Sequence, residues 1–249
     1  MSPFEIAAKP PPAYTLVADQ LRMAIQIGHY LPGEQFPPER ALAEQLGVSR
    51  TTIREAARVL EGEGLVETRH GRTGGLRVLD RRLPAAEVRR LLREREAHIE
   101  TVFDFRLPVE RAAARLAARK RTKAELGKLR SLLEQMRKII AERDTPEAEN
   151  QSAVARWKAV DTEFHLTIAR AARNPMLEEA VLKGRAEMFH PINAVFTKIH
   201  PYMEESHERI VEAIGNKDAE EADRLMGDHI EETRASVLHY VKTGRPYLP

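Results

Sequence analysis

The chain of 249 residues contains no cysteine. It therefore has no disulfide framework, no thiolate zinc site and no cysteine nucleophile. No apolar run reaches the roughly 20 residues that a membrane-spanning helix needs, and the first residues lack the apolar core of a signal peptide. We therefore expect a cytoplasmic protein with no membrane partner. Glycine motifs of the P-loop, Rossmann and nucleophile-elbow types are also missing, which removes the usual sequence signs of an enzyme.

Positive charge is concentrated in one region. The whole chain has a formal net charge of only +2, but the segment from Arg40 to Arg95 holds thirteen arginines, no lysine and eight acidic residues, a local balance of +5. A regional excess of arginine favours a localised contact with nucleic acid over a generally sticky polycation.

The most informative segment is FPPERALAEQLGVSRTTIREAARVLEGEGLVETRHGRTGGLRV, residues 36–78. Glu39–Leu46 has an amphipathic helical pattern, and Gly47 follows where a left-handed residue ends a helix. Ser49 is a good N-cap for a second helix. Arginines recur on one face of that helix at every fourth position: Arg50, Arg54 and Arg58. A helix, a glycine turn and an arginine-faced helix predict a helix-turn-helix, whose second helix enters the major groove.

A basic hairpin is expected directly after that helix. Leu65–His70 and Leu76–Leu79 are predicted strands, and Gly71–Gly75 is the turn between them. Such a hairpin is typical of a wing, with four basic side chains available for phosphates or a minor groove: Arg69, His70, Arg72 and Arg77. The plainer alternative is a solvated arginine face on an ordinary helical domain, but the cap, the turn and the hairpin together favour DNA binding.

The stretch Tyr14–Val78 resembles the winged helix-turn-helix of GntR-type bacterial transcription regulators, almost without gaps. Pro38 departs from the family pattern, which usually has a capping serine there. Proline is acceptable in a first helical turn, so we expect a lost cap hydrogen bond and retained function. The resemblance implies these operator-contacting residues: Arg40, Ser49, Arg50, Thr51, Thr52, Arg54, His70 and Gly71.

From about Asp80 the sequence shows helical periodicity almost to its end, with no alternating strand pattern. The expected helices are Glu87–Arg119 (one or two helices, with Pro108 marking a break, a kink or a first turn), Lys123–Arg143, Ala153–Arg173, Met176–Phe196, Tyr202–Asn216 and Ala219–Val241. We therefore predict a mainly α protein. A flexible arm (1–13) precedes the winged domain (14–80). A linker with a first connecting helix (81–95) then leads to an all-α antiparallel bundle of six or seven helices (96–243).

Four side chains of the bundle form a candidate metal-binding set. Asp161 and His165 are four residues apart on one predicted helix, and His207 and His229 lie on two later helices. One carboxylate and three imidazoles suit Zn²⁺, Ni²⁺ or Mn²⁺ with positions left for water or a ligand. Spacing alone leaves open that these residues are separate, hydrogen-bonded members of the bundle.

The second half also resembles the FCD ligand-binding domain of the FadR subfamily, in the runs VDTEFHLTIARAARNPML, ESHERIVEAI and AEEADRLMGDHIEET. That family has Asp-x-x-x-His on one helix and a histidine on each of two later helices. The resemblance implies a divalent metal, with zinc favoured, held by Asp161, His165, His207 and His229. The other histidines match no ligand position and are expected to be structural or surface residues: His29, His98, His190, His200 and His239.

Arg106 matches the first residue of the family's Arg-x-x-x-Glu at the opening of the ligand domain. An arginine beside a metal would clamp a carboxylate of a small organic acid. The competing interpretation is an internal ion pair with Glu110, four residues further along the same helix.

These observations predict a homodimeric transcription regulator, with repression favoured, that binds a near-palindromic operator and senses a small organic acid at the metal. Two variants stay open, in which the metal is purely structural or is itself the sensed signal. A metal-dependent hydrolase is a remote alternative, since no well-placed base accompanies the ligands. A nucleoid-type DNA binder would leave the histidine set without a purpose.

Overall fold

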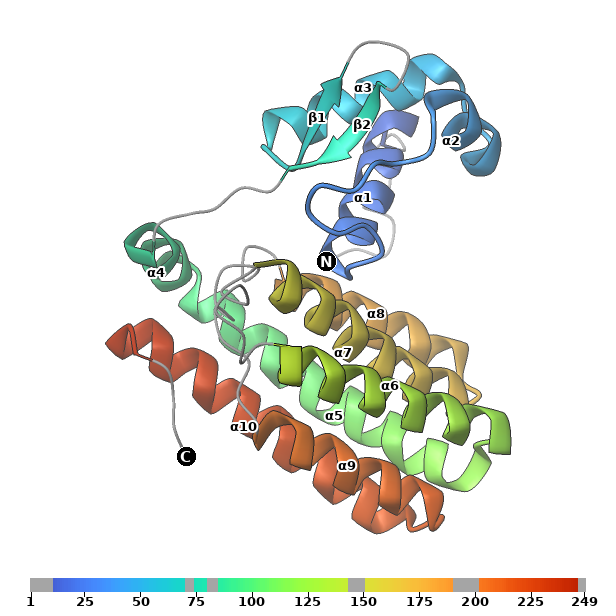
Figure 1. Cartoon of the computed structure of the whole chain (residues 1–249), viewed down its shortest axis with the longest axis vertical. Coiled ribbons are helices and arrows are strands. Elements are labelled where there is room, and N and C mark those ends of the chain that lie inside the picture. Colours follow the sequence, from blue (N-terminus) through green and yellow to red (C-terminus); the bar gives the residue numbers. More distant parts are fainter. Residues whose placement is uncertain (1–10, 70–73, 80–84, 143–150, 190–201, 246–249) are drawn as a thin grey trace, which may run out of the picture. The chain divides into compact units, whose positions relative to one another are not determined.

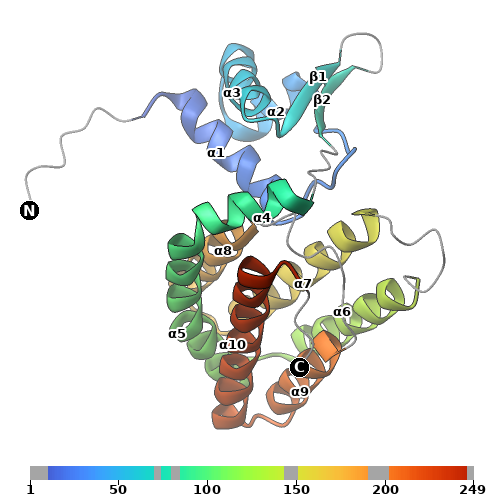
Figure 2. The same ribbon diagram turned by 90° about the vertical axis from the view of Figure 1, so that its left-hand side faces the viewer.

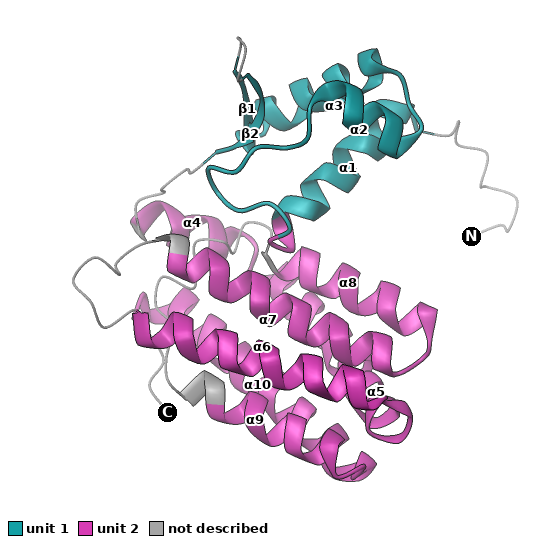
Figure 3. Cartoon of the chain, turned by 45° about the vertical axis from the view of Figure 1, so that its right-hand side comes forward, with its two compact units in different colours: residues 1–25, 29–81 teal, residues 26–28, 82–249 magenta. Residues whose placement is uncertain are grey.

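The chain divides into two compact units. The computed structural model describes residues 11–69, 74–79, 85–142, 151–189 and 202–245. One unit comprises residues 1–25 and 29–81, and the other comprises residues 26–28 and 82–249 (Figure 3). Each unit has its own cluster of buried hydrophobic side chains. The domain limit predicted between residues 80 and 81 lies outside the described residues, so the domain limits stay predictions.

The first unit is a winged helix-turn-helix, as predicted (Figure 1). Its helices are α1 (Ala13–Gln26), α2 (Glu39–Leu46) and α3 (Arg50–Gly62), and its strands are β1 (Val66–Arg69) and β2 (Gly75–Val78). The strands pair antiparallel, with Val66 opposite Val78 and Arg69 opposite Gly75. The apolar faces of all five elements meet in one core, which includes Leu21, Leu42, Ile53, Leu60, Val66 and Val78.

The turn between α2 and α3 forms for the reasons given by its sequence. Gly47 has a φ of 65°, and its N–H is directed at the last carbonyls of α2. The Ser49 hydroxyl accepts a hydrogen bond from the Thr52 N–H at 3.1 Å, which caps α3. At the start of α2 the N-cap is Pro38, with no side-chain cap bond, as expected.

Gly75 is needed where the hairpin meets the segment before α2. A Cβ on Gly75 would lie 2.3 Å from Nε2 of Gln35, which donates to the Gly74 carbonyl at 2.9 Å. The buried Phe36 follows, and its N–H donates to the Leu76 carbonyl at 2.8 Å. The hairpin is therefore fixed to the body of the unit and not only to its own turn.

The second unit is an all-α bundle, as predicted. Its helices are α4 (Ala85–Glu94), α5 (Glu96–Lys120), α6 (Lys123–Glu142), α7 (Gln151–Ala171), α8 (Pro175–Phe189), α9 (Tyr202–Gly215) and α10 (Ala219–Thr243). Helix α5 contacts α7, α8, α9 and α10, and it runs beside α10 for much of its length (Figure 2). This central position lets residues of α5 meet those of four other helices. No helix within the described ranges combines the length and apolar character of a membrane-spanning segment.

Of the three alternatives predicted for Pro108, the helix break and the first-turn position were wrong. Helix α5 continues through Pro108, and the chain instead breaks at Arg95, between α4 and α5. An internal proline costs about 3 kcal/mol because it removes a backbone hydrogen bond and crowds the preceding turn. The face of α5 that packs on its neighbours buries Val102, Phe103, Ala113 and Ala117, and this burial offsets the cost.

Candidate metal centre and nucleic-acid interface

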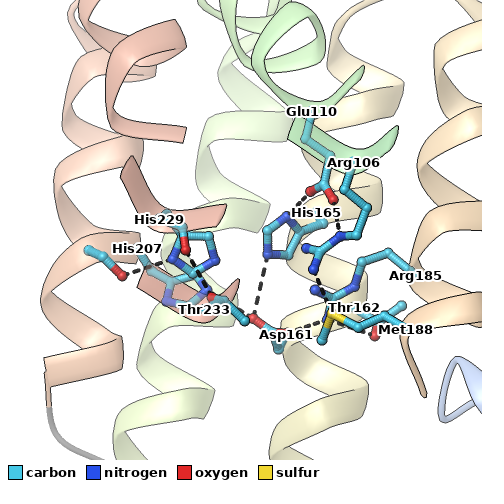
Figure 4. A network of polar contacts seen from close by, with 11 residues as sticks. Arg106, Glu110, Asp161, Thr162, His165, Arg185, Met188, His207, His229 and Thr233 are labelled. Atoms are coloured by element: carbon cyan, nitrogen blue, oxygen red, sulfur yellow. Dashed lines mark hydrogen bonds and ion pairs between the residues drawn. The ribbon is translucent and has the colours of Figure 1, made fainter. Parts of the chain in front are cut away.

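Four polar side chains from three helices meet inside the second unit. Asp161 and His165 project from α7, His207 from α9 and His229 from α10. All four are buried, and one candidate ligand atom from each lies within 4.8 Å of the others. The sequence could place two of these residues on one face of a helix, and the fold brings the other two to them (Figure 4).

Neighbouring groups orient the three imidazole rings. His165 Nδ1 lies against a carboxylate oxygen of Glu110, while Nε2 is 3.6 Å from Asp161 Oδ1 and has no hydrogen-bond partner among the described residues. His207 Nε2 is 2.9 Å from the same Asp161 oxygen. His229 Nδ1 is 3.0 Å from the Ser206 hydroxyl, which leaves its Nε2 directed elsewhere. A buried nitrogen that makes no hydrogen bond among the described residues, beside a carboxylate and two further imidazoles, suits a cation.

The electrostatics of the cluster favour the protonation states that metal binding requires. Burial, followed by the neighbouring rings of His207 and His165, holds the pKa of His229 well below its usual range, so this imidazole is neutral. Burial by itself would raise the pKa of Asp161. Arg185 and the two histidine contacts outweigh it and hold that pKa well below its usual range. A neutral imidazole and an ionised carboxylate are the forms that bind metals.

Two buried arginines border the cluster on the side away from His207 and His229 (Figure 4). Arg106 donates from Nε to Glu110 Oε1 at 2.7 Å, so the ion pair that competed with effector binding is present. Its Nη2 is buried without a hydrogen-bond partner among the described residues. Arg185, on α8, pairs with Asp161. Both arginines are 1% exposed, so protein groups and not bulk water surround their guanidinium groups.

Four residues were not identified from the sequence in the roles that they have in the structure. Glu110 contacts His165 as well as Arg106, and only its spacing from Arg106 was readable. The role of Arg185 could not be predicted from sequence spacing, because its partner Asp161 lies on another helix. Lys158 is also buried, and burial lowers its pKa to about 7. Gly184 was not identified from the sequence either. A Cβ at this position would come within 3.0 Å of Arg106 Cγ.

The arginine face of α3 is exposed, and an acidic residue of α2 forms ion pairs with two of its arginines. Glu39 lies 2.9 Å from Arg54 Nε and 3.6 Å from Arg50 Nη2, whose side chains are 54% and 59% exposed. Arg40, on α2, is 81% exposed and lies 3.8 Å from Glu44. In water these pairs are weak, so phosphates or bases can replace the carboxylates.

The other predicted DNA-contacting residues differ in exposure and in their hydrogen bonds. Thr51 is exposed beside Arg50. The Ser49 hydroxyl is already used as a cap and is 2.9 Å from the Thr52 hydroxyl. The predicted wing-tip residues His70 and Gly71 lie outside the described residues.

Comparison with known proteins identifies the family. Residues 13–75 match the family of bacterial regulatory proteins called gntR, and residues 101–232 match the FCD domain. The Uxu operon transcriptional regulator of Escherichia coli K12 is 31% identical over 242 residues, covering 91% of this chain and 87% of the relative. The chain belongs to the GntR family of transcription regulators and carries an FCD domain.

Other relatives agree with this assignment. The Exu regulon transcriptional regulator of Escherichia coli K12 is 30% identical, over 91% of this regulator and 84% of the relative. The Glc operon transcriptional activator of the same strain is 27% identical, over 93% and 91%. The solved structure of Escherichia coli McbR/YncC superposes with a TM-score of 0.53 at 21% identity, covering 92% of this chain and 99% of that one, which shows the shared fold. The protein is a DNA-binding regulator and not an enzyme.

Proposed function

We propose that this regulator recognises a near-palindromic operator as a homodimer and that a small organic acid, bound beside a divalent metal, controls its affinity for DNA. Family membership supports the DNA-binding part, because GntR proteins are transcription regulators. The observation that carries the sensing part is the buried meeting of Asp161, His165, His207 and His229. In a bacterium the operator and its regulator occupy the cytoplasm.

For operator binding, helix α3 enters the major groove. Arg50 and Arg54 suit bidentate contacts with guanine, each worth about 1–3 kcal/mol of discrimination. The remaining proposed contacts serve phosphates or the wing: Arg40, Ser49, Thr51, Thr52, His70 and Gly71. Both arginines are exposed, and among the described residues Glu39 is the acidic partner of each, which supports this role.

The metal we propose is zinc, with nickel and manganese as alternatives, held by Asp161, His165, His207 and His229. The donor set of three imidazoles and one carboxylate fits such an ion, and so does His165 Nε2, which faces Asp161 Oδ1 at 3.6 Å and makes no hydrogen bond among the described residues. When bound, the ion supplies a Lewis-acidic charge that attracts an oxygen of an organic acid. Arg106 borders the same cluster, and its buried Nη2 supports a second contact with that acid.

A route from the cluster to the linker helix supports coupling between the units. Helix α10 carries His229 near its middle and ends at Thr243. The Nε groups of Arg89 and Arg93 on α4 each donate to the Val241 carbonyl at 3.3 Å. Movement of α10 on ligand binding would therefore move α4, the first helix of the second unit. Couplings of this kind are commonly worth about 1–3 kcal/mol.

Two substitutions test the division of labour. We expect Arg54→Ala to weaken specific operator binding at least tenfold while the zinc content stays at the wild-type level, because it removes a base contact and a weak surface pair with Glu39. His207→Ala should lose zinc and the response to acids while it keeps specific DNA binding. The measurements are gel-shift affinity for an operator selected from random DNA, and metal analysis of the purified protein. Damage to both activities by both substitutions in folded protein would sink the proposal.

A second candidate is that the metal is itself the signal. Asp161 also pairs with Arg185 and His207, so its charge has partners when no metal is bound. An operator affinity that changes with zinc alone, and not further with acids, would favour this reading. Repression is the sign we propose, and because one relative is named an activator, in vitro transcription from the operator decides it.

A further inference from the structure

Arg185 is a buried cation whose carboxylate partner is one of the proposed metal ligands. Its guanidinium pairs through Nη2 with Asp161 Oδ2, and the same nitrogen is 3.2 Å from the Thr162 hydroxyl. Arg185 is 1% exposed and Asp161 is 4% exposed, so water does not screen the pair. Figure 4 places Arg185 on the side of Asp161 opposite His207 and His229.

The two oxygens of Asp161 face different partners. Oδ1 faces the imidazoles, 2.9 Å from His207 Nε2 and 3.6 Å from His165 Nε2, and Oδ2 faces Arg185. A cation among the imidazoles would draw on the same carboxylate charge that stabilises Arg185. Arg106 is in a different position, because its partner Glu110 is not one of the four ligands and contacts only the far nitrogen of His165. A bound metal would therefore weaken the pairing of Arg185 with Asp161 more than the pairing of Arg106 with Glu110.

The charge balance of the cluster sharpens this difference. Two guanidinium groups and two carboxylates, Arg106 and Arg185 with Glu110 and Asp161, sum to zero. Because imidazoles bind metals in their neutral form, a bound divalent ion would leave +2 in a buried place. Uncompensated buried charge is strongly unfavourable, so the loaded cluster needs an anion. Arginine is well suited to hold a carboxylate through two parallel hydrogen bonds.

We propose that Arg185 competes with the metal for Asp161 and, once that pairing is weakened, serves as the anion-binding group for the carboxylate of the effector. This deepens the proposed function and rests on it. It also sets an order, in which the metal-loaded protein binds a small carboxylate and the metal-free protein does not.

The rival role for Arg185 is to hold Asp161 in position as a metal ligand. The two roles predict opposite signs for the same substitution. A competitor lowers metal affinity, so its removal raises affinity. A positioning residue raises metal affinity, so its removal lowers affinity by the factor of about 10–100 usual for such partners. The sign therefore decides between the two roles without knowledge of the natural effector.

The first experiment compares wild type with Arg185→Gln and Arg185→Lys. Zinc affinity is measured by competition with a chromogenic chelator, and unfolding temperature is measured with and without zinc. We expect Arg185→Gln to lower the metal-free unfolding temperature and to raise zinc affinity at least threefold, so the stabilisation by zinc grows. Arg185→Lys keeps a cation beside Asp161 and should stay within about twofold of wild type. A fall in zinc affinity of Arg185→Gln, in protein with wild-type helical circular dichroism, would overturn the competition.

The second experiment uses acetate and glycolate as probes, with chloride at matched ionic strength as control. Zinc-loaded wild type should be stabilised by a probe, whereas metal-free wild type and zinc-loaded Arg185→Gln should need at least tenfold more of it. An equal response in Arg185→Gln or in the metal-free protein, or no response of zinc-loaded wild type to either probe, rejects Arg185 as the anion-binding group. A wild-type protein that binds no divalent metal at all would instead reject the proposed function.

Discussion

At the scale of single residues, Glu110 shows how one carboxylate serves two neighbours. It accepts from Arg106 on its own helix and lies against His165 Nδ1 on α7. Burial would raise the pKa of Glu110, but Arg106 and His165 outweigh it and keep the carboxylate ionised. A carboxylate beside Nδ1 favours the tautomer with its proton there, which leaves Nε2 free to bind a metal.

Glu110→Gln should therefore lower zinc affinity about 10–100-fold, the usual effect of removing a carboxylate that orients a metal-bound histidine. Chelator competition measures this, and Glu163→Gln is the matched control. Glu163 lies on α7 two residues from Asp161 but faces Arg170 at the surface. Unchanged affinity in Glu110→Gln would mean that His165 needs no such orientation.

Lys158 makes stability depend on pH in a direction that can be worked out. Burial lowers its pKa to about 7, whereas an unfolded lysine titrates near 10.4. Between these values the folded protein has released a proton that the unfolded chain keeps. The contribution of Lys158 to stability is thus fully present above about pH 10.4 and is lost as the pH falls to about 7.

We expect the free energy of unfolding in urea to rise from pH 7 towards pH 10, and Lys158→Met to flatten this rise. The slope from one group is at most about 1.4 kcal/mol per pH unit. The control is Lys138→Met, because Lys138 is 69% exposed and has no buried charge to lose. An identical pH profile in Lys158→Met and wild type would show that burial does not govern this amine.

At the scale of elements, helix α10 joins the sensing cluster to helix α4. Its last turn is closed by Gly244 in the left-handed conformation, where a Cβ would approach Arg89 Nη1 to 3.0 Å. Arg89 and Arg93 donate to the last carbonyls of α10, which is also where the helix dipole is negative. These bonds are the contacts between α4 and α10 that a shift of α10 would pull on.

The double substitution Arg89→Ala with Arg93→Ala should keep both zinc binding and basal operator affinity but lose most of the effect of ligand on that affinity. Fluorescence anisotropy with labelled operator measures the ratio of the operator affinities with and without zinc and acid. Arg90→Ala is the control, because Arg90 pairs only with Glu94 of its own helix among the described residues. A ratio equal to that of wild type in the double variant would exclude this route.

The sequence predicted most helices because each buries one periodic face, and the ends of α2 and α3 because Gly47 and Ser49 act locally. It left three alternatives open at Pro108, and a break and a first-turn position were wrong, because contacts with four distant helices outweigh a local preference. The meeting of His207 and His229 with Asp161 depends on tertiary packing, so the family resemblance and not the spacing predicted it. Arg185 was missed for the same reason.

At the scale of the whole molecule, each unit has a separate hydrophobic core. The proposed DNA binding belongs to the first unit, and the proposed metal and effector binding belongs to the second. Leu60, fully buried, belongs to the core of the first unit, and Leu129, equally buried, belongs to that of the second. Neither residue is one of the proposed DNA-binding or metal-binding residues. Substituting either one should thus alter the stability of one unit without altering the chemistry of the other.

Leu60→Ala and Leu129→Ala should each destabilise their own unit by about 2–5 kcal/mol, the range for a buried leucine. Differential scanning calorimetry is the measurement, with zinc and operator DNA as markers. A zinc concentration 100 times the dissociation constant stabilises the unit that binds it by about 2.7 kcal/mol. Zinc should raise the transition that Leu129→Ala lowers, and operator DNA the one that Leu60→Ala lowers. If either substitution lowered a single shared transition, the two units would unfold cooperatively, and the predicted independence of their cores would be wrong.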